Sequence, residues 1–275
     1  MKIKDINIEN NEQNLALCEV LNLSVPELKL NKEKEIPKKT YKKYQKIVKR
    51  LENKPIQYIL KKANFYGKDY YINKNVLIPR PETEELVQET HNLIKKHLKK
   101  ENISILDIGT GSGVIALTLK DINPNYDITA TDISKKALKV AKKNKKEHKL
   151  DIDLIKTDLF FGINKKFDVI ISNPPYIPLN AFIEEKVKKN EPNIALYGGY
   201  DGLDYYKKIF ANVKDILKKD YILAFEIHES LGNNLKILSK KYFPNDKILI
   251  KQDNNSLDRY LYIISGDNSE KYKNI

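Results

Sequence analysis

The feature that most constrains the fold is a glycine-rich loop between a short apolar run and a helix-forming one. The loop reads Asp-Ile-Gly-Thr-Gly-Ser-Gly over residues 107–113. Glycine tolerates the backbone conformations that such a loop requires. In open α/β sheets, the first strand-to-helix turn lies at the ligand-binding edge. The loop therefore predicts a strand at 104–107, a helix from about residue 114, and a ligand site between them.

Downstream of the loop, strand-forming and helix-forming segments alternate. We expect further strands at 128–132, 153–156, 169–172 and 221–227, with a helix from Ser134. Such alternation is typical of a doubly wound, parallel α/β sheet. Residues 247–251 and 259–264 are close enough in sequence to form a terminal antiparallel pair. The sequence thus predicts a mostly parallel, seven-stranded, Rossmann-like sheet.

Two smaller regions precede this sheet. Apolar residues at three- and four-residue intervals, as in the stretch from Thr40 to Leu51, predict a small helical domain over residues 1–62. Aromatic and β-branched residues around Gly67 predict a β-hairpin linker over 63–79. We expect the main α/β domain to occupy 80–266 and the polar residues 267–275 to form a flexible tail.

The glycine spacing indicates a nucleoside cofactor other than a dinucleotide. A dinucleotide fingerprint expects Gly or Ala at position 114, where this chain has Val114. The pattern instead resembles motif I of the class I S-adenosylmethionine-dependent methyltransferases. We therefore expect S-adenosylmethionine to be bound by the loop residues Asp107, Gly109, Thr110, Gly111, Ser112 and Gly113.

Two further strand ends belong to the same expected site. Asp132 ends the second strand, where its carboxylate can accept hydrogen bonds from both ribose hydroxyls of a nucleoside, and Ile133 follows it. Asp158 and Leu159 follow the third strand, at the place that faces the adenine ring in methyltransferases of this class. All four are predicted cofactor-binding residues.

The fourth strand ends in the tetrapeptide Asn173, Pro174, Pro175 and Tyr176. The Asn173 side chain offers a carbonyl acceptor, and the prolines remove backbone donors so that the Pro174 carbonyl can point outward. Two fixed acceptors can hold both hydrogens of a planar –NH₂ group while Tyr176 covers its face. The same acceptors stabilise positive charge that grows on the nitrogen, so neither a metal nor a strong general base is required.

This tetrapeptide predicts methyl transfer to a planar nitrogen, with Asn173, Pro174 and Tyr176 as catalytic residues. Asn173 is also expected to border the cofactor, and the whole tetrapeptide to bind the substrate. The motif is equally suited to the exocyclic amine of adenine and to the side-chain amide of glutamine. Its chemistry alone leaves both open.

Longer segments resemble the peptide chain release factor glutamine methyltransferases, the HemK/PrmC family, over nearly the whole chain. Besides the two motifs, they are residues 55–60, 65–67, 76–84 and 191–203, and a terminal group comprising Asp253, Asp258 and Arg259. Two positions depart from the family pattern. Lys61 stands where the family usually has Gly, which puts the entry to the hairpin in doubt. His228 also stands where Gly is common, near the end of the fifth strand.

The resemblance implies a specific reaction and partner. A class I methyltransferase domain would transfer the methyl group of S-adenosylmethionine to the side-chain nitrogen of the glutamine in a release factor's Gly-Gly-Gln motif. The N-terminal domain would dock the release factor, and residues 173–176 would hold the glutamine. Arg80, inside the segment 76–84, is an expected substrate-binding residue.

Two other functions remain open from the sequence. An adenine-amino methyltransferase acting on DNA or RNA shares the tetrapeptide, although no target-reading domain is evident. A non-catalytic module that binds a release factor or the ribosome is the other, although the intact motifs argue against a vestigial pocket. The sequence does not identify the preferred release factor.

The net charge of +13 invites a nucleic-acid function, but its distribution weakens that inference. Residues 29–62 hold thirteen Lys or Arg against three Glu, which accounts for most of the excess. Forty-seven of the fifty basic residues are Lys, so few side chains offer the planar fork that reads bases or phosphates. We expect a solvated Lys-rich surface, whose contact with protein or RNA the sequence does not determine, and no requirement for nucleic acid.

Because arginine is rare in this chain, the position of each arginine is informative: Arg is favoured where a bidentate pair is needed. We predict that Arg80 and Arg259 form carboxylate pairs that fix loops beside the pocket. The single cysteine, Cys18, excludes an internal disulfide and is expected to be a small buried apolar residue. His91, His97 and His148 show no metal-ligand spacing. The chain has no long apolar run, and Met1 to Asn7 lack the apolar segment of a secretory signal, so we expect a cytoplasmic protein that uses no membrane. We also expect it to be a monomer.

Overall fold

The computed structural model describes residues 2–265, so the expected tail at 267–275 lies outside the described residues. The described residues form two compact units. One contains residues 2–62 together with 184–190, and the other contains residues 63–183 and 191–265. The sequence predicts one continuous domain over 80–266, from which the structure differs in the short segment 184–190.

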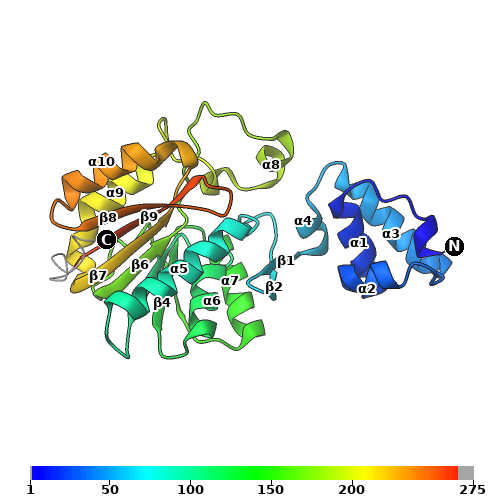
Figure 1. The fold of residues 1–275 in the computed structure, drawn as a ribbon, viewed down its shortest axis with the longest axis horizontal. Helices are drawn as coiled ribbons and strands as arrows, with labels where there is room; N and C mark the ends of the chain where they lie inside the picture. Colours follow the sequence, from blue (N-terminus) through cyan, green and yellow to red (C-terminus); the bar gives the residue numbers. More distant parts are fainter. Residues whose placement is uncertain (1, 266–275) are drawn as a thin grey trace. The chain divides into compact units, whose positions relative to one another are not determined.

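The first unit is built from short helices (Figure 1). The Asn10 side chain accepts the Gln13 N–H at the start of the first helix, and Ser24 and Glu27 form a reciprocal capping box at the start of the second. The helices are α1 (Asn11–Leu21), α2 (Val25–Leu30), α3 (Lys38–Leu51), α4 (Ile56–Leu60) and α8 (Glu185–Asn190). Their shared core includes Ala16, Leu17, Leu28, Tyr44, Leu51 and Ile56.

Helix α8 joins this unit through polar contacts. Lys186 forms an ion pair with Glu12, and the Asn190 side-chain amide donates to the Asn53 carbonyl at 2.9 Å. Glu12 also accepts the backbone N–H of Ile56 at 2.8 Å. One carboxylate therefore ties together α1, the start of α4 and α8, a link that an apolar pattern does not reveal.

Lys61 ends α4 in the left-handed conformation, with φ of +57°. This backbone costs a non-glycine residue roughly 1–2 kcal/mol, which explains why glycine suits the position. The hairpin that follows pairs β1 (Lys62–Phe65) with β2 (Lys68–Tyr71) through Tyr66 and Gly67, both at positive φ, as tight hairpin turns require. It is shorter than the predicted linker, because residues 73–76 form a separate turn.

The second unit contains the predicted seven-stranded sheet, in the order β5-β4-β3-β6-β7-β9-β8. Strands β5, β4, β3, β6 and β7 are parallel, whereas β9 runs antiparallel to both β7 and β8. The fold prediction is confirmed, including the terminal antiparallel pair. The strands are β3 (Ser104–Ile108), β4 (Asp127–Asp132), β5 (Asp153–Lys156), β6 (Phe167–Ser172), β7 (Leu217–Glu226), β8 (Lys247–Gln252) and β9 (Asp258–Ile264).

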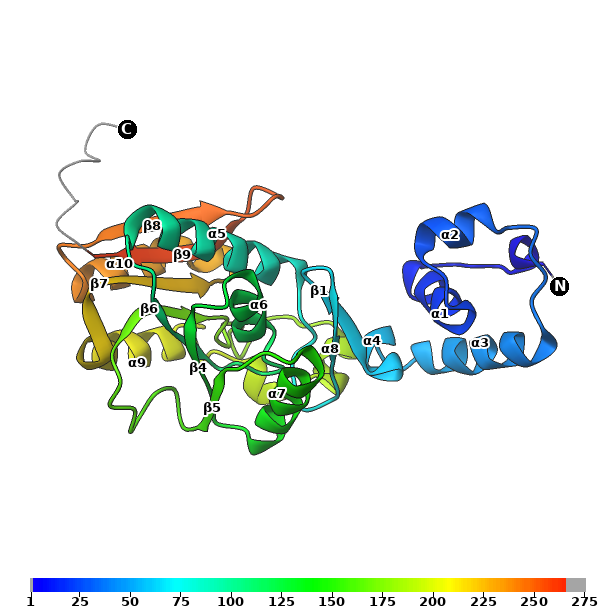
Figure 2. The same cartoon turned by 90° about the horizontal axis from the view of Figure 1, so that it is seen from below.

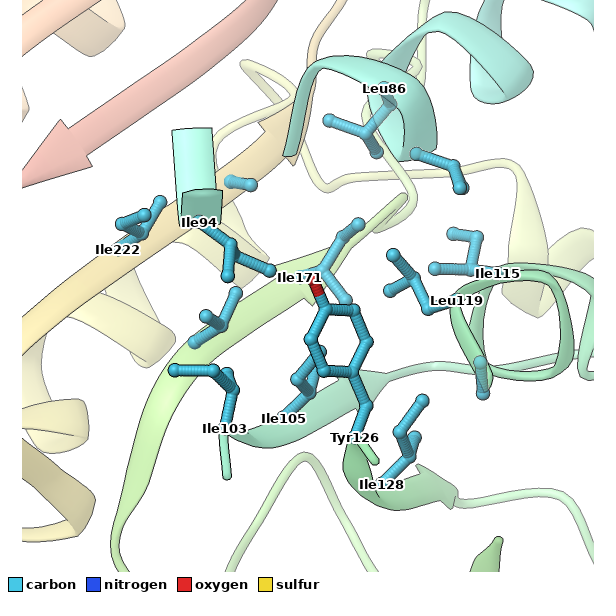
Figure 3. Packing of buried hydrophobic residues seen from close by; sticks show 14 of the residues in the cluster. Leu86, Ile94, Ile103, Ile105, Ile115, Leu119, Tyr126, Ile128, Ile171 and Ile222 are labelled. Carbon is cyan, nitrogen blue, oxygen red and sulfur yellow. The ribbon is translucent and has the colours of Figure 1, made fainter. Parts of the chain in front are cut away.

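Helices cover both faces of this sheet (Figure 1; Figure 2). Neighbouring residues of a strand point to opposite faces, so Ile171 packs on the α5 and α6 side and Ile170 on the α9 and α10 side. Figure 3 shows the first of these layers, where Leu86 and Ile94 of α5 meet Ile115 and Leu119 of α6. The helices are α5 (Pro81–His97), α6 (Val114–Ile122), α7 (Lys135–His148), α9 (Asp204–Asn212) and α10 (Gly232–Tyr242).

In residues 2–265, no helix is both long enough and apolar enough to traverse a bilayer.

Candidate active site

A cavity opens at the carboxyl ends of β3, β4, β5 and β6. It lies where the strand order reverses, because β4 and β5 follow on one side of β3 whereas β6 and β7 lie on the other. This is the ligand-binding edge of doubly wound sheets. Most of the predicted site residues line it: Arg80, Gly109, Thr110, Gly111, Ser112, Asp132, Ile133, Asp158, Leu159, Asn173, Pro174 and Pro175. Asp107, Gly113 and Tyr176 lie outside this lining.

The glycine loop offers open backbone on one side and tight packing on the other. Gly109 has φ of +73°, and a Cβ built there would meet no atom within 4 Å. A Cβ on Gly113 would lie 3.2 Å from Ala141 Cβ on α7. Gly109 therefore leaves room for a ligand to approach the backbone, whereas Gly113 allows α7 to pack closely.

Two carboxylates support this loop from different depths. Asp107 is fully buried and accepts the Thr110 hydroxyl at 2.6 Å, and burial raises its pKa to about 7. Asp132 reaches the cavity and accepts the N–H of Gly111 at 2.9 Å and of Ser134 at 2.7 Å. Burial also raises the Asp132 pKa, and the two N–H donors oppose that shift.

The end of β5 contributes a fixed apolar wall. Leu159 adopts a positive φ of +51°, and its carbonyl accepts the Thr131 hydroxyl at 2.6 Å. Its side chain is buried, whereas the neighbouring Asp158 is exposed at the cavity rim. Because Thr131 lies on β4, the hydrogen bond holds the β5 loop at the cavity edge.

The acceptor tetrapeptide follows β6 directly. The Asn173 side-chain nitrogen donates to the Thr83 hydroxyl at 3.2 Å, and the Tyr176 hydroxyl donates to Glu226 at 3.1 Å. Thr83 in turn donates to the other Glu226 oxygen at 2.6 Å. Burial first, and then the Glu226 carboxylate, raise the pKa of Tyr176, so its hydroxyl stays protonated.

The segment 191–203 packs against the back of the tetrapeptide. A Cβ on Gly198 would lie 2.6 Å from the Pro175 carbonyl oxygen, and one on Gly202 would lie 2.4 Å from the Tyr176 carbonyl oxygen. The Gly198 N–H also donates to the Ile177 carbonyl at 2.8 Å. These glycines allow two backbones to touch, which fixes the tetrapeptide from behind.

Both predicted arginine pairs are present. Arg80 bonds Glu191 at 2.5 Å, and the second Glu191 oxygen accepts the Ile78 N–H at 3.1 Å. Arg259 pairs with Asp253 at 3.0 Å. Arg80 therefore fixes the segment 191–203 to the strand-to-helix connection before α5.

Three polar residues at the site were not predicted from the sequence. Thr83 and Glu226 join α5 to β7 next to the tetrapeptide. Asn144 of α7 is fully buried and donates to the carbonyls of Ser112, at 2.8 Å, and Tyr71, at 3.0 Å. Its only signal in the sequence is a polar residue at an apolar position of a helix.

The histidines form no metal site within residues 2–265, where no group of three or more His, Cys, Asp or Glu side chains could hold an ion. His228, one of the two departures, has an ordinary φ of −73° and accepts the Ser230 N–H through Nδ1. Its backbone therefore does not require glycine.

Known proteins resemble this chain at the level of its domains and of its whole length. A family model of the PrmC N-terminal domain matches residues 2–60, and one of the methyltransferase small domain matches residues 84–188. The release factor glutamine methyltransferase of Bacillus cereus is 36% identical over 260 residues, covering 92% of both chains. This chain belongs to the release factor glutamine methyltransferase family. The predicted resemblance is thereby confirmed.

Another relative supports the same family, and more distant solved structures share the fold. The Bacillus subtilis enzyme of the same name is 38% identical over 217 residues, covering 76% of this chain and 74% of the relative. A methyltransferase from Pyrococcus furiosus superimposes with a TM-score of 0.54 at 21% identity, covering 81% of this chain and 98% of that one. The catalytic domain of hMettl16, in complex with an RNA hairpin, gives 0.55 at 15% identity, covering 82% and 93%. The two structures support the fold alone.

Proposed function

We propose that this protein transfers a methyl group from S-adenosylmethionine to the side-chain amide nitrogen of the glutamine in the Gly-Gly-Gln motif of peptide chain release factors. Family membership supports the reaction and the class of substrate. The observation that carries the chemistry is the position of Asn173 and Pro174 at the cavity, directly beyond β6 and beside the glycine loop.

The cavity residues fit S-adenosylmethionine. The open backbone at Gly109 admits a close ligand, and each Asp132 oxygen accepts one N–H while keeping lone pairs for further donors such as ribose hydroxyls. Ile133 and Leu159 offer apolar contacts at the rim. When bound, S-adenosylmethionine supplies an electrophilic methyl group on a sulfonium ion.

The protein's own contribution is orientation and electrostatic stabilisation. Asn173 Oδ1 and the Pro174 carbonyl would accept the two amide hydrogens of glutamine and direct the nitrogen lone pair toward the methyl group. The N–CH₃ bond would form as the S–CH₃ bond of the donor breaks, with the S–CH₃ electron pair staying on sulfur. Positive charge would then grow on the nitrogen, where both acceptors stabilise it until one proton is lost to solvent. Tyr176 would flank the planar amide, and Arg80 would support the loop around the substrate.

We assign release-factor docking to residues 2–62, because the family model of the PrmC N-terminal domain covers residues 2–60. We also propose that the protein acts as a monomer and needs no nucleic acid. Analytical ultracentrifugation tests the first statement. Activity on nuclease-treated release factor tests the second.

The decisive experiment offers a labelled methyl donor together with a release factor, its Gln→Ala variant in the Gly-Gly-Gln motif, and duplex DNA or structured RNA. We expect label on the unmodified release factor only, with mass spectrometry locating the methyl group on the glutamine side chain. Label on nucleic acid and none on the release factor would favour an adenine-amino methyltransferase instead.

A further inference from the structure

A buried hydrogen-bond chain connects Asn173 to a carboxylate that never reaches the cavity. Asn173 Nδ2 lies 3.2 Å from Thr83 Oγ1, which lies 2.6 Å from Glu226 Oε2. Thr83 is 3% exposed and Glu226 is 1% exposed, so water does not compete for the bond between them, whereas Asn173 is partly exposed at the cavity. These two hydrogen bonds link α5, the end of β7 and the tetrapeptide.

The polarity of this chain follows from counting protons. An ionised carboxylate can only accept hydrogen bonds, so Thr83 must donate its single hydroxyl proton to Glu226. Its oxygen is then left as an acceptor, which selects the amide nitrogen of Asn173 rather than the carbonyl oxygen. Asn173 Oδ1 consequently faces away from Thr83.

We propose that Glu226 and Thr83 are positioning residues that hold the Asn173 amide with its carbonyl oxygen toward the substrate nitrogen. The reaction requires this orientation, because a reversed amide would set the Asn173 –NH₂ against the –NH₂ group of the substrate. Two opposed donors cannot form a hydrogen bond, and the substrate nitrogen would lose one of its two acceptors. The inference rests on the proposed amide methylation.

Glu226 also orients the second side chain of the tetrapeptide. Its Oε1 accepts the Tyr176 hydroxyl at 3.1 Å, and its backbone carbonyl accepts the Tyr206 hydroxyl at 2.6 Å. One carboxylate therefore sets both the amide plane of Asn173 and the ring of Tyr176.

Protonation of Glu226 would reverse the direction of both hydrogen bonds. A carboxylic acid donates to Thr83, which frees the Thr83 proton for Asn173 Oδ1. Burial raises the Glu226 pKa, while the Thr83 and Tyr176 hydrogen bonds and the charge of Arg259 lower it and Glu82 raises it. The titratable or charged groups that face Glu226 are Glu82 on α5, Tyr176 after β6, Tyr206 on α9, and Arg259, Tyr260 and Tyr262 on β9.

The first test compares Thr83→Val, Thr83→Ser and Thr90→Val in the full chain. Thr90 is a matched control, since it lies on the same helix and is also buried, but does not line the cavity. We expect Thr83→Val to lower kcat at least about tenfold, the scale of one lost orienting hydrogen bond, with cofactor affinity within about twofold. Thr83→Ser should restore kcat to within about threefold, and Thr90→Val should leave it unchanged.

The second test is the pH profile of kcat. In the wild type, kcat should fall as the pH falls through the pKa of Glu226, and Glu226→Gln should have a low kcat without that acidic limb. Full kcat in Thr83→Val, or an unchanged acidic limb in Glu226→Gln, would overturn the proposal. If the wild type methylates no release factor, the proposed function fails instead. Cofactor binding by each variant reports correct folding. If Glu226→Gln does not fold, the comparison of Thr83→Val with Thr83→Ser decides the proposal.

Discussion

Asn173 and Asp107 are polar residues at neighbouring strand ends, but their environments differ. Asn173 lines the cavity and is partly exposed, whereas Asp107 is fully buried beneath the glycine loop. We expect the first to contact substrate. The second acts on the loop through Thr110.

We expect Asn173→Ala to remove most methyl transfer while cofactor affinity stays within a few-fold. The variant loses the proposed acceptor for the substrate nitrogen, yet the glycine loop and Asp132 are untouched. Loss of one preorganised polar group of this kind costs roughly 10²–10³ in kcat. Single-turnover kinetics and calorimetric titration with S-adenosylhomocysteine measure the two quantities. A variant that keeps its fold but no longer binds the cofactor would show that Asn173 is primarily a cofactor ligand.

Asp107→Asn should change the pH dependence of stability. The Asp107 pKa is raised to about 7 in the folded chain, above its value of ~3.9 when unfolded. Its stabilising contribution is therefore complete below about pH 4 and is lost as the pH rises through about 7. Without cofactor, the variant should match the wild type near pH 4 and exceed its melting temperature at pH 8. A difference that is independent of pH would mean that Asp107 does not titrate in this range.

At the scale of elements, the contact between the segment 191–203 and the tetrapeptide depends on glycines, which have no side chain. Gly198→Ala would place a Cβ 2.6 Å from the Pro175 carbonyl oxygen and 2.8 Å from Tyr176 Cα, both parts of the backbone. Since neither can turn aside, we expect a loss of about 1–3 kcal/mol and a fall in kcat as the tetrapeptide shifts.

The control for Gly198→Ala is Gly162→Ala, which has positive φ but open space around its Cβ. It should cost about 1–2 kcal/mol from the backbone alone and leave kcat unchanged. Chemical denaturation and steady-state kinetics separate these effects. Equal kcat in both variants would show that the segment 191–203 does not fix the tetrapeptide.

The elements were largely predictable, because the apolar runs of buried strands and the apolar spacing of helices are local patterns. The positions of β5 and β6 and the loops after β3 and β4 followed from such patterns. The insertion of β9 between β7 and β8 did not, since sequence proximity indicates pairing but not which strand lies at the edge. Thr83 and Glu226 are 143 residues apart, and a side-chain hydrogen bond over that separation leaves no periodic trace.

At the scale of the whole molecule, the structure separates the expected docking region from the expected catalytic region, except that α8 belongs with the former. No apolar residue of α8 is buried, and its attachment depends on Glu12 and Asn53. Such polar attachment is invisible to hydrophobic patterning. The apolar pattern therefore predicts that segment 184–190 belongs with its sequence neighbours.

Cofactor binding should stabilise the molecule through the second unit, which holds every cavity residue. A ligand that binds only the folded state at a hundred times its Kd contributes about 2.7 kcal/mol. For a domain of this size that corresponds to a rise of roughly 5–10 °C in melting temperature. We expect this rise with S-adenosylhomocysteine, and greater protection from hydrogen exchange in residues 107–113.

Asp132→Ala should abolish most of that rise, because the variant loses the carboxylate that faces the cavity and orients the Gly111 N–H. The comparison uses the ligand-induced shift rather than the absolute melting temperature, so a general loss of stability does not mimic the effect. Asp215→Ala is the matched control, since Asp215 is an exposed aspartate of the same unit outside the cavity, and it should keep the full shift. An undiminished shift in Asp132→Ala would show that the cofactor is held without the carboxylate at the end of β4.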